Sequence, residues 1–99
     1  MIQANIQIDG EHETANGWLY TLSIEWGDEN ESPTDHEITM AWVDHEHLAG
    51  GTISPSVVIE AVAKIAVDHF GRAHMPARFD LSNLRRRIEG FDSILKSVL

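Results

Sequence analysis

The sequence predicts an α+β domain in which a three-stranded antiparallel β-meander is followed by three helices packed on one face (βββααα). Two patterns support this prediction. Short segments of the first half alternate apolar and polar residues, whereas the second half has the apolar spacing of helices. The chain has 99 residues, of which 42% are apolar, enough for one packed core. We therefore expect residues 1–99 to form a single globular domain.

Three segments carry the period-2 pattern of strands. Residues 2–9 alternate without a break, and residues 18–26 and 37–42 repeat the pattern. Residues 10–17 end in an Asn-Gly turn dipeptide, and residues 27–35 contain a proline that does not fit a strand interior. Because the connections are short, we expect neighbouring strands to pair antiparallel.

The three tryptophans share the parity of the aliphatic residues in these strands. Trp18, Trp26 and Trp42 are therefore predicted to lie in the core rather than to form a stacking platform. The opposite face of the sheet is half polar. It is expected to be either plain solvent surface or a dimer contact.

A long helix follows the strands. Ser54 and Pro55 form a helix start, and the helix is expected over residues 55–70, ending at Gly71. It is apolar over most of its circumference, with one narrow polar stripe made by Glu60, Lys64 and Asp68. Such a helix is expected to be buried on more than one side.

Two short helices complete the predicted fold. Asp80 can cap a helix over residues 81–88 that ends near Gly90. Asp92 can cap a last helix, in which four apolar residues are expected to face inward: Ile94, Leu95, Val98 and Leu99.

Composition excludes some functions and disfavours others. There is no cysteine, which excludes disulfides, thiol nucleophiles, Cys-ligated zinc and iron–sulfur clusters. Residues 1–5 do not resemble a secretory signal, and no apolar run approaches the roughly 18 residues of a membrane span. We therefore expect a cytoplasmic protein that does not bind membranes.

Charge is distributed unevenly along the chain. The net charge is −9, and residues 1–50 contain eleven acidic residues and no lysine or arginine, whereas residues 51–99 contain all seven basic residues and five acidic ones. The acidic half repels phosphate backbones, so nucleic-acid binding is disfavoured. The asymmetry is explained either by solubility and attraction between the two halves, or by an acidic surface that docks a basic partner.

The segment V-D-H-E-H-L-A-G-G at residues 43–51 offers a candidate metal site. If it is extended, His45 and His47 point the same way and could bind zinc or another transition metal. If it is a capped helical turn, the two side chains diverge by about 200° and cannot share one ion. The sequence leaves both conformations open.

Three histidines have acidic neighbours in the sequence. His12, His36 and His45 each lie between two carboxylates, which would favour the charged imidazole and make the protein change charge below pH 7. The alternative is that all three are solvated loop residues.

Two further segments could bind a ligand or a partner. Residues 50–56 lead into a helix N-terminus that could attract an anion, although the lysine of a phosphate-binding loop is absent. Arg85, Arg86 and Arg87 form the only basic run. They could dock an acidic peptide, a phosphate group or RNA, or they could form a solvated helix face that pairs with the acidic half of the same chain or of a second copy.

No sequence motif indicates catalysis. There is no G-x-S-x-G nucleophile elbow, and the carboxylates lie mostly in predicted loops. We therefore interpret the chain as a small acidic domain that acts as a non-enzymatic protein-interaction module. Its partner is expected to be another protein or a second copy of itself. The sequence favours a protein that is not an enzyme. The alternative is a small metal-binding protein or metal-dependent enzyme that uses His45 and His47.

Overall fold

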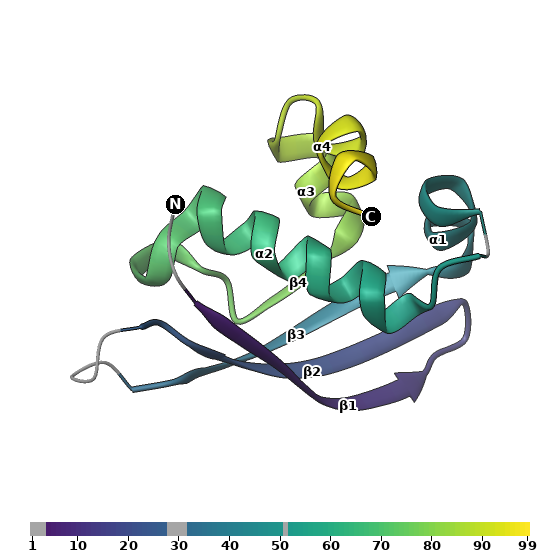
Figure 1. Cartoon of the computed structure of the whole chain (residues 1–99). Helices are drawn as coiled ribbons and strands as arrows, with labels where there is room; N and C mark the ends of the chain where they lie inside the picture. Colours follow the sequence, from purple (N-terminus) through teal and green to yellow (C-terminus); the bar gives the residue numbers. More distant parts are fainter. Residues whose placement is uncertain (1–3, 28–31, 51) are drawn as a thin grey trace.

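The computed structural model describes residues 4–27, 32–50 and 52–99, and it is an α+β fold with a four-stranded mixed sheet and four helices (Figure 1). In chain order the elements are β1 (Asn5–Glu13), β2 (Gly17–Glu25), β3 (Thr34–Ala41), α1 (Trp42–Ala49), α2 (Pro55–His74), β4 (Arg78–Asp80), α3 (Leu81–Arg87) and α4 (Phe91–Val98). The predicted βββααα order is therefore only roughly right, because it lacks α1 and β4.

The sheet has the strand order β1-β2-β3-β4. The pairs β1–β2 and β2–β3 are antiparallel, as the short connections predict, whereas β3–β4 is parallel. The chain between β3 and β4 forms α1 and α2, and α2 crosses one face of the sheet (Figure 1). The helices α3 and α4 stack on the same side, so the other sheet face is not covered by any helix of the described residues.

Strand β1 is longer than its sequence pattern indicates. The alternation stops at Asp9, but the strand continues to Glu13 through a bulge between Ile8 and Gly10. The extra residue shifts the alternation by one position, so Glu11 lies opposite Tyr20 and accepts a hydrogen bond from its hydroxyl. Burial and this carboxylate together raise the pKa of Tyr20 above its usual value.

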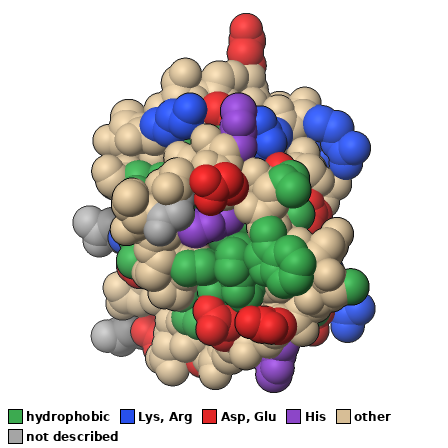
Figure 2. Space-filling view, turned by 90° about the vertical axis from the view of Figure 1, so that its right-hand side faces the viewer, with side chains coloured by type: hydrophobic (Ala, Val, Ile, Leu, Met, Phe, Trp, Pro, Cys, Tyr) green, Lys and Arg blue, Asp and Glu red, His purple; other side chains and the backbone are tan. Residues whose placement is uncertain are grey.

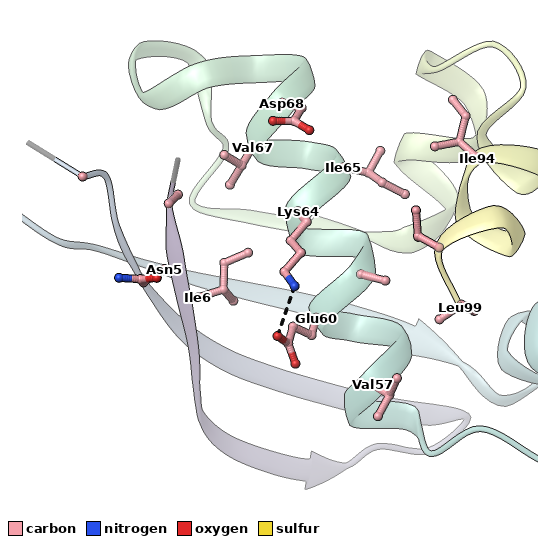
Figure 3. A pocket seen from close by; sticks show the side chains of 14 residues that line it. Asn5, Ile6, Val57, Glu60, Lys64, Ile65, Val67, Asp68, Ile94 and Leu99 are labelled. Carbon is pink, nitrogen blue, oxygen red and sulfur yellow. Dashed lines mark ion pairs between the residues drawn. The ribbon is translucent and has the colours of Figure 1, made fainter. Parts of the chain in front are cut away.

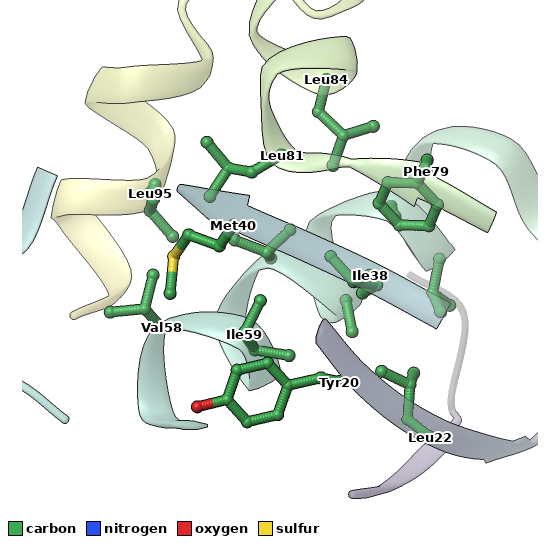
Figure 4. Packing of buried hydrophobic residues seen from close by; sticks show 14 of the residues in the cluster. Tyr20, Leu22, Ile38, Met40, Val58, Ile59, Phe79, Leu81, Leu84 and Leu95 are labelled. Carbon is green, nitrogen blue, oxygen red and sulfur yellow. The ribbon is translucent and has the colours of Figure 1, made fainter. Parts of the chain in front are cut away.

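The core lies between the sheet and the helices (Figure 4). Tyr20, Ile38 and Met40 point from the sheet toward one side of α2, where Val58 and Ile59 are fully buried. Leucines of the last two helices close the same cluster: Leu81, Leu84 and Leu95. Each such side chain contributes roughly 1.5–3 kcal/mol through burial, so this cluster fixes how the helices sit on the sheet.

The boundaries of α2 and α3 follow the signals in the sequence, whereas the start of α4 does not. α2 begins at Pro55 as predicted, and its regular part ends at Gly71, whose φ of 69° breaks the helix before a last turn to His74. α3 begins after Asp80, whose carboxylate accepts the Ser82 backbone N–H while the Asn83 side chain accepts the Asp80 N–H. α4 begins after Gly90, so the predicted cap at Asp92 is one of its first-turn residues instead.

The tryptophans differ in burial, and the prediction that all three are core residues is wrong for one. Trp26 is buried and donates its indole N–H to Thr34 Oγ1 at 2.8 Å. Trp18 is half-buried, and Trp42 is 46% exposed. The reason is that β3 ends at Ala41, so Trp42 begins a helix and the strand parity no longer applies to it.

Within the described ranges, no helix is both long enough and apolar enough to cross a membrane.

Candidate interaction surfaces

The segment with the two paired histidines is helical. α1 runs from Trp42 to Ala49 and ends at Gly50, which has the left-handed conformation (φ 64°) of a helix C-cap. Two residues apart on a helix, His45 and His47 diverge by about 200°. His45 is buried and His47 is exposed. The extended conformation that the metal interpretation requires is therefore not found.

The geometry adds no further support for a metal centre. His45 Nε2 lies 2.7 Å from the carbonyl oxygen of Ile53, which can only accept, so this ring nitrogen donates to it. Among residues 4–27, 32–50 and 52–99, no group of three or more His, Cys, Asp or Glu side chains could hold a metal ion. The hydrogen bond instead ties α1 to the start of α2.

An exposed aromatic surface, here called the Trp patch, is formed by Trp18 of β2 and Trp42 of α1. Their rings meet edge to face with centroids 6.4 Å apart, and the ring of His45 packs against Trp18 at 5.3 Å. Figure 2 shows this end of the molecule, where hydrophobic side chains gather in the centre of the face and acidic side chains lie above and below them.

Acidic residues lie beside the Trp patch because of the strand pairing and the helix spacing. Glu13 lies opposite Trp18 in the β1–β2 pairing, and directly opposed residues point to the same face. Glu46 follows Trp42 by four residues on α1, which places the two on one side of the helix. The strands β1–β3 and α1 all belong to the half of the sequence without lysine or arginine. Glu13 and Glu46 therefore place negative charge beside the apolar centre of the patch.

A second apolar surface, here called the α2/α4 groove, runs along α2 between the start of the edge strand β1 and α4 (Figure 3). A hollow of about 800 Å³ extends over α2, with the start of β1 on one side and α4 on the other. Three of its side chains are strongly exposed for aliphatic residues: Val57 (49%), Ile94 (40%) and Val98 (61%). Ile65 and Ile94 point toward each other across the groove.

Two apolar residues of α4 lie at the surface, contrary to the prediction. The sequence pattern places Ile94 and Val98 inward, but only Leu95 and Phe91 of α4 are buried. The helix is too short and too displaced toward one flank of α2 to cover its outer side. The polar stripe of α2 lies beside the exposed aliphatic side chains of the groove, and in it Lys64 Nζ lies 3.4 Å from Glu60 Oε1.

Arg85 is not on the surface as a free cation. Its guanidinium contacts both carboxylate oxygens of Asp92 at 2.9 Å and reaches Asp44 of α1 at 3.1 Å. The hydrogen bonds to Asp92 and the charge of both carboxylates raise the pKa of Arg85 further above its usual value, against the effect of burial. Arg85 therefore joins α3, α4 and α1, and the pair with Asp44 links the two halves of the sequence.

The next two arginines in the sequence, Arg86 and Arg87, are not part of this ion-pair cluster. Arg86 is exposed, and Arg87 has its guanidinium 5.9 Å from the ring centroid of Phe70. The three arginines thus do not form one flat binding surface. Docking of an acidic partner by Arg85, Arg86 and Arg87 stays a prediction that the structure does not test.

His36 is a buried residue of β3 and not a loop residue. Its Nε2 lies 2.6 Å from Thr34 Oγ1, and its Nδ1 lies 2.6 Å from the carbonyl oxygen of Pro76. The Pro76 carbonyl oxygen can only accept, so Nδ1 carries a proton and donates to it, while Thr34 Oγ1 also accepts from the Trp26 indole. The adjacent Asp35 and Glu37 point to the opposite face of the strand. Sequence neighbours are therefore not the groups that this ring contacts.

The uncovered face of the sheet is polar and internally paired. Ser23 donates to Asp9 at 2.9 Å, Thr39 donates to Asp80 at 2.6 Å, and Arg78 lies 3.2 Å from Glu37. Although burial opposes ionisation, hydrogen bonds from Ser82 and Thr39 hold the pKa of Asp80 below its usual value. This face offers satisfied polar groups rather than an apolar docking surface.

The expected anion site at residues 50–56 includes Gly51, which lies outside the described residues. In the part that is described, Ser54 precedes α2 and its hydroxyl lies 3.4 Å from that of Ser56. The anion site stays a prediction.

Comparison of the chain with known protein families, curated proteins and solved structures finds no match.

Proposed function

We propose that the protein is a non-enzymatic interaction module whose Trp patch binds a basic segment of a partner protein. The observation that carries this proposal is the exposed indole of Trp42, held against Trp18 on elements that contribute acidic residues and no lysine or arginine of their own. An aromatic centre with an acidic surround suits an arginine- or lysine-containing chain.

The chemistry of such a contact is well defined. An arginine guanidinium placed over an indole gains about 0.5–1 kcal/mol at an exposed site, and more where water is excluded. Tryptophan is among the residues that most often dominate binding energy at protein interfaces. The acidic surround adds long-range attraction, which raises the rate at which a basic partner arrives.

The Trp patch is also held in place by contacts behind it. The backbone N–H of Trp42 donates to the carbonyl of Asn16 in the β1–β2 turn at 2.9 Å. His45 fixes the other side of α1 through its hydrogen bond to Ile53 and packs against Trp18. A surface that is already ordered loses less conformational entropy on binding, which favours affinity.

Isothermal titration calorimetry with two peptides tests the proposal. Hexa-arginine is expected to bind the full chain in low-salt buffer, and hexa-glutamate is expected not to bind. Trp42→Ala should weaken hexa-arginine binding about tenfold, because it removes the exposed indole but none of the charges. The matched control is Val98→Ala, which removes exposed apolar surface from the α2/α4 groove and should leave the affinity unchanged.

Two outcomes would refute the proposal. If hexa-arginine does not bind, the acidic surround does not act as a docking surface. If it binds equally well to the parent protein and to Trp42→Ala, the attraction is a general effect of net charge and the Trp patch has no part in it.

A further inference from the structure

The α2/α4 groove is separate from the Trp patch, because neither Trp18 nor Trp42 lines it. It contains three of the five large apolar side chains that are exposed in the described residues. We propose that a second copy of this chain docks on this groove, so that α2 of each copy packs against α2 of the other about a two-fold axis.

The outer side of α2 has the residue spacing that such packing requires. Val57, Ala61 and Ile65 follow one another at intervals of four, so they form a single ridge along the helix. Ridges of this kind interdigitate when two helices cross at about −50°. A two-fold axis beside the small Ala61 allows close approach, and it places Val57 of one copy next to Ile65 of the second copy. Isoleucine and valine of α4 extend the same surface on one flank.

The charges beside this ridge are complementary to the same charges on a second copy. Glu60, Lys64 and Asp68 alternate in sign along the edge of the groove, and Glu60 and Lys64 already pair within one chain (Figure 3). In an antiparallel arrangement centred near Ala61, Glu60 of one copy comes near Lys64 of the second copy, and the reverse pair forms by symmetry. A partner with a single sign of charge would meet repulsion at one of these positions.

The charge of the rest of the molecule favours the same face. The net charge is −9, and the half of the sequence that forms β1–β3 and α1 carries eleven acidic residues without a basic one. Two copies that met through their sheets would bring these acidic residues together. Contact through α2 and α4 places the sheets on the outside of the dimer and leaves both Trp patches accessible.

Sedimentation equilibrium of the full chain over a range of concentrations tests the proposal. The parent protein is expected to approach twice its 11.1 kDa mass as the concentration rises. Lys64→Glu and Glu60→Lys should each weaken the dimer about tenfold, because each change replaces two attractive contacts by repulsive ones. An equimolar mixture of the two variants should dimerise again, since every Glu60–Lys64 contact then has opposite charges.

Control measurements distinguish loss of this interface from loss of the fold. Both changed residues are exposed, and circular dichroism should show the parent spectrum and a similar melting temperature. Trp42→Ala should dimerise like the parent, because its side chain lies outside the groove. A parent protein that remains monomeric at every concentration would overturn the proposal. A dimer unaffected by Lys64→Glu, or a mixture that fails to restore it, would show that the copies meet elsewhere and would overturn it equally.

Discussion

The protein presents two apolar surfaces that differ in chemistry. The Trp patch is aromatic, is surrounded by acidic residues, and belongs to the half of the sequence without lysine or arginine. The α2/α4 groove is aliphatic, and the charges along its edge alternate in sign. The first surface suits a partner of opposite charge, and the second suits a copy of itself. Both proposals therefore rest on the charges at the border of each surface and not on apolar exposure alone.

One ion-pair cluster joins helices that contribute to the two surfaces. Arg85 of α3 holds Asp44 of α1, which carries the Trp patch, and Asp92 of α4, which borders the groove. The strongest way to break both surfaces together is therefore a single change at this half-buried arginine.

Arg85→Ala should lower the free energy of unfolding by about 2 kcal/mol, because it removes charge-assisted hydrogen bonds and leaves two carboxylates close together without their cation. Urea unfolding followed by circular dichroism measures this change. The neighbouring Arg86→Ala is the matched control, and it should cost less than about 0.5 kcal/mol because Arg86 is exposed. Equal effects of the two substitutions would show that the cluster does not hold the helices together.

Asp80→Asn should lower the free energy of unfolding by a smaller amount, about 1 kcal/mol at neutral pH. The reason is that the cap of α3 keeps one acceptor but loses its charge. The pKa of Asp80 is lower in the folded than in the unfolded chain, where it is about 3.9. Its charge therefore stabilises the fold fully above that pH, and the contribution is lost as the pH falls through the folded-state pKa.

Urea unfolding of both proteins across acidic pH measures this dependence. The difference in unfolding free energy between parent and Asp80→Asn should stay constant from neutral pH down to about pH 5, and it should shrink below about pH 4. A difference that grows as the pH falls would contradict the direction of the pKa shift.

The smallest expected effect is the difference in how salt changes binding at the two surfaces. Raising the ionic strength to about 1 M shortens the Debye length to about 3 Å, so it should weaken hexa-arginine binding several-fold. The dimer should change less, because its contact is mainly aliphatic and its charges alternate. Calorimetry and sedimentation at low and high salt compare the two, and an equal loss would remove the distinction between the surfaces.

Local signals in the sequence are sufficient for much of the fold. The α+β class, the three antiparallel strands, the start of α2 at Pro55 and the cap at Asp80 all follow from residues close in sequence. β4 cannot be predicted in this way. It has three residues, Arg78 to Asp80, and it is a strand only because distant β3 pairs with it.

The two surfaces are harder to predict, for different reasons. The strand pattern places Trp42 in the core only if the strand is continued one residue beyond its true end at Ala41. The helix α1 could have been recognised from Gly50, because glycine commonly ends a helix. Helical spacing places Ile94 and Val98 in the core, but an apolar residue in a short helix indicates burial without saying what buries it. Packing between α2 and α4, which leaves these side chains exposed, depends on the whole fold.

The most direct test of the proposed binding surface is a titration of the ¹⁵N-labelled chain with hexa-arginine, followed through its three indole N–H signals. We predict that the signals of Trp42 and Trp18 shift with the added peptide, while that of Trp26 stays in place because its N–H is held by Thr34 in the interior. Signals of Trp42 and Trp18 that remain unchanged at saturating peptide, or a shift confined to Trp26, would contradict the proposed surface.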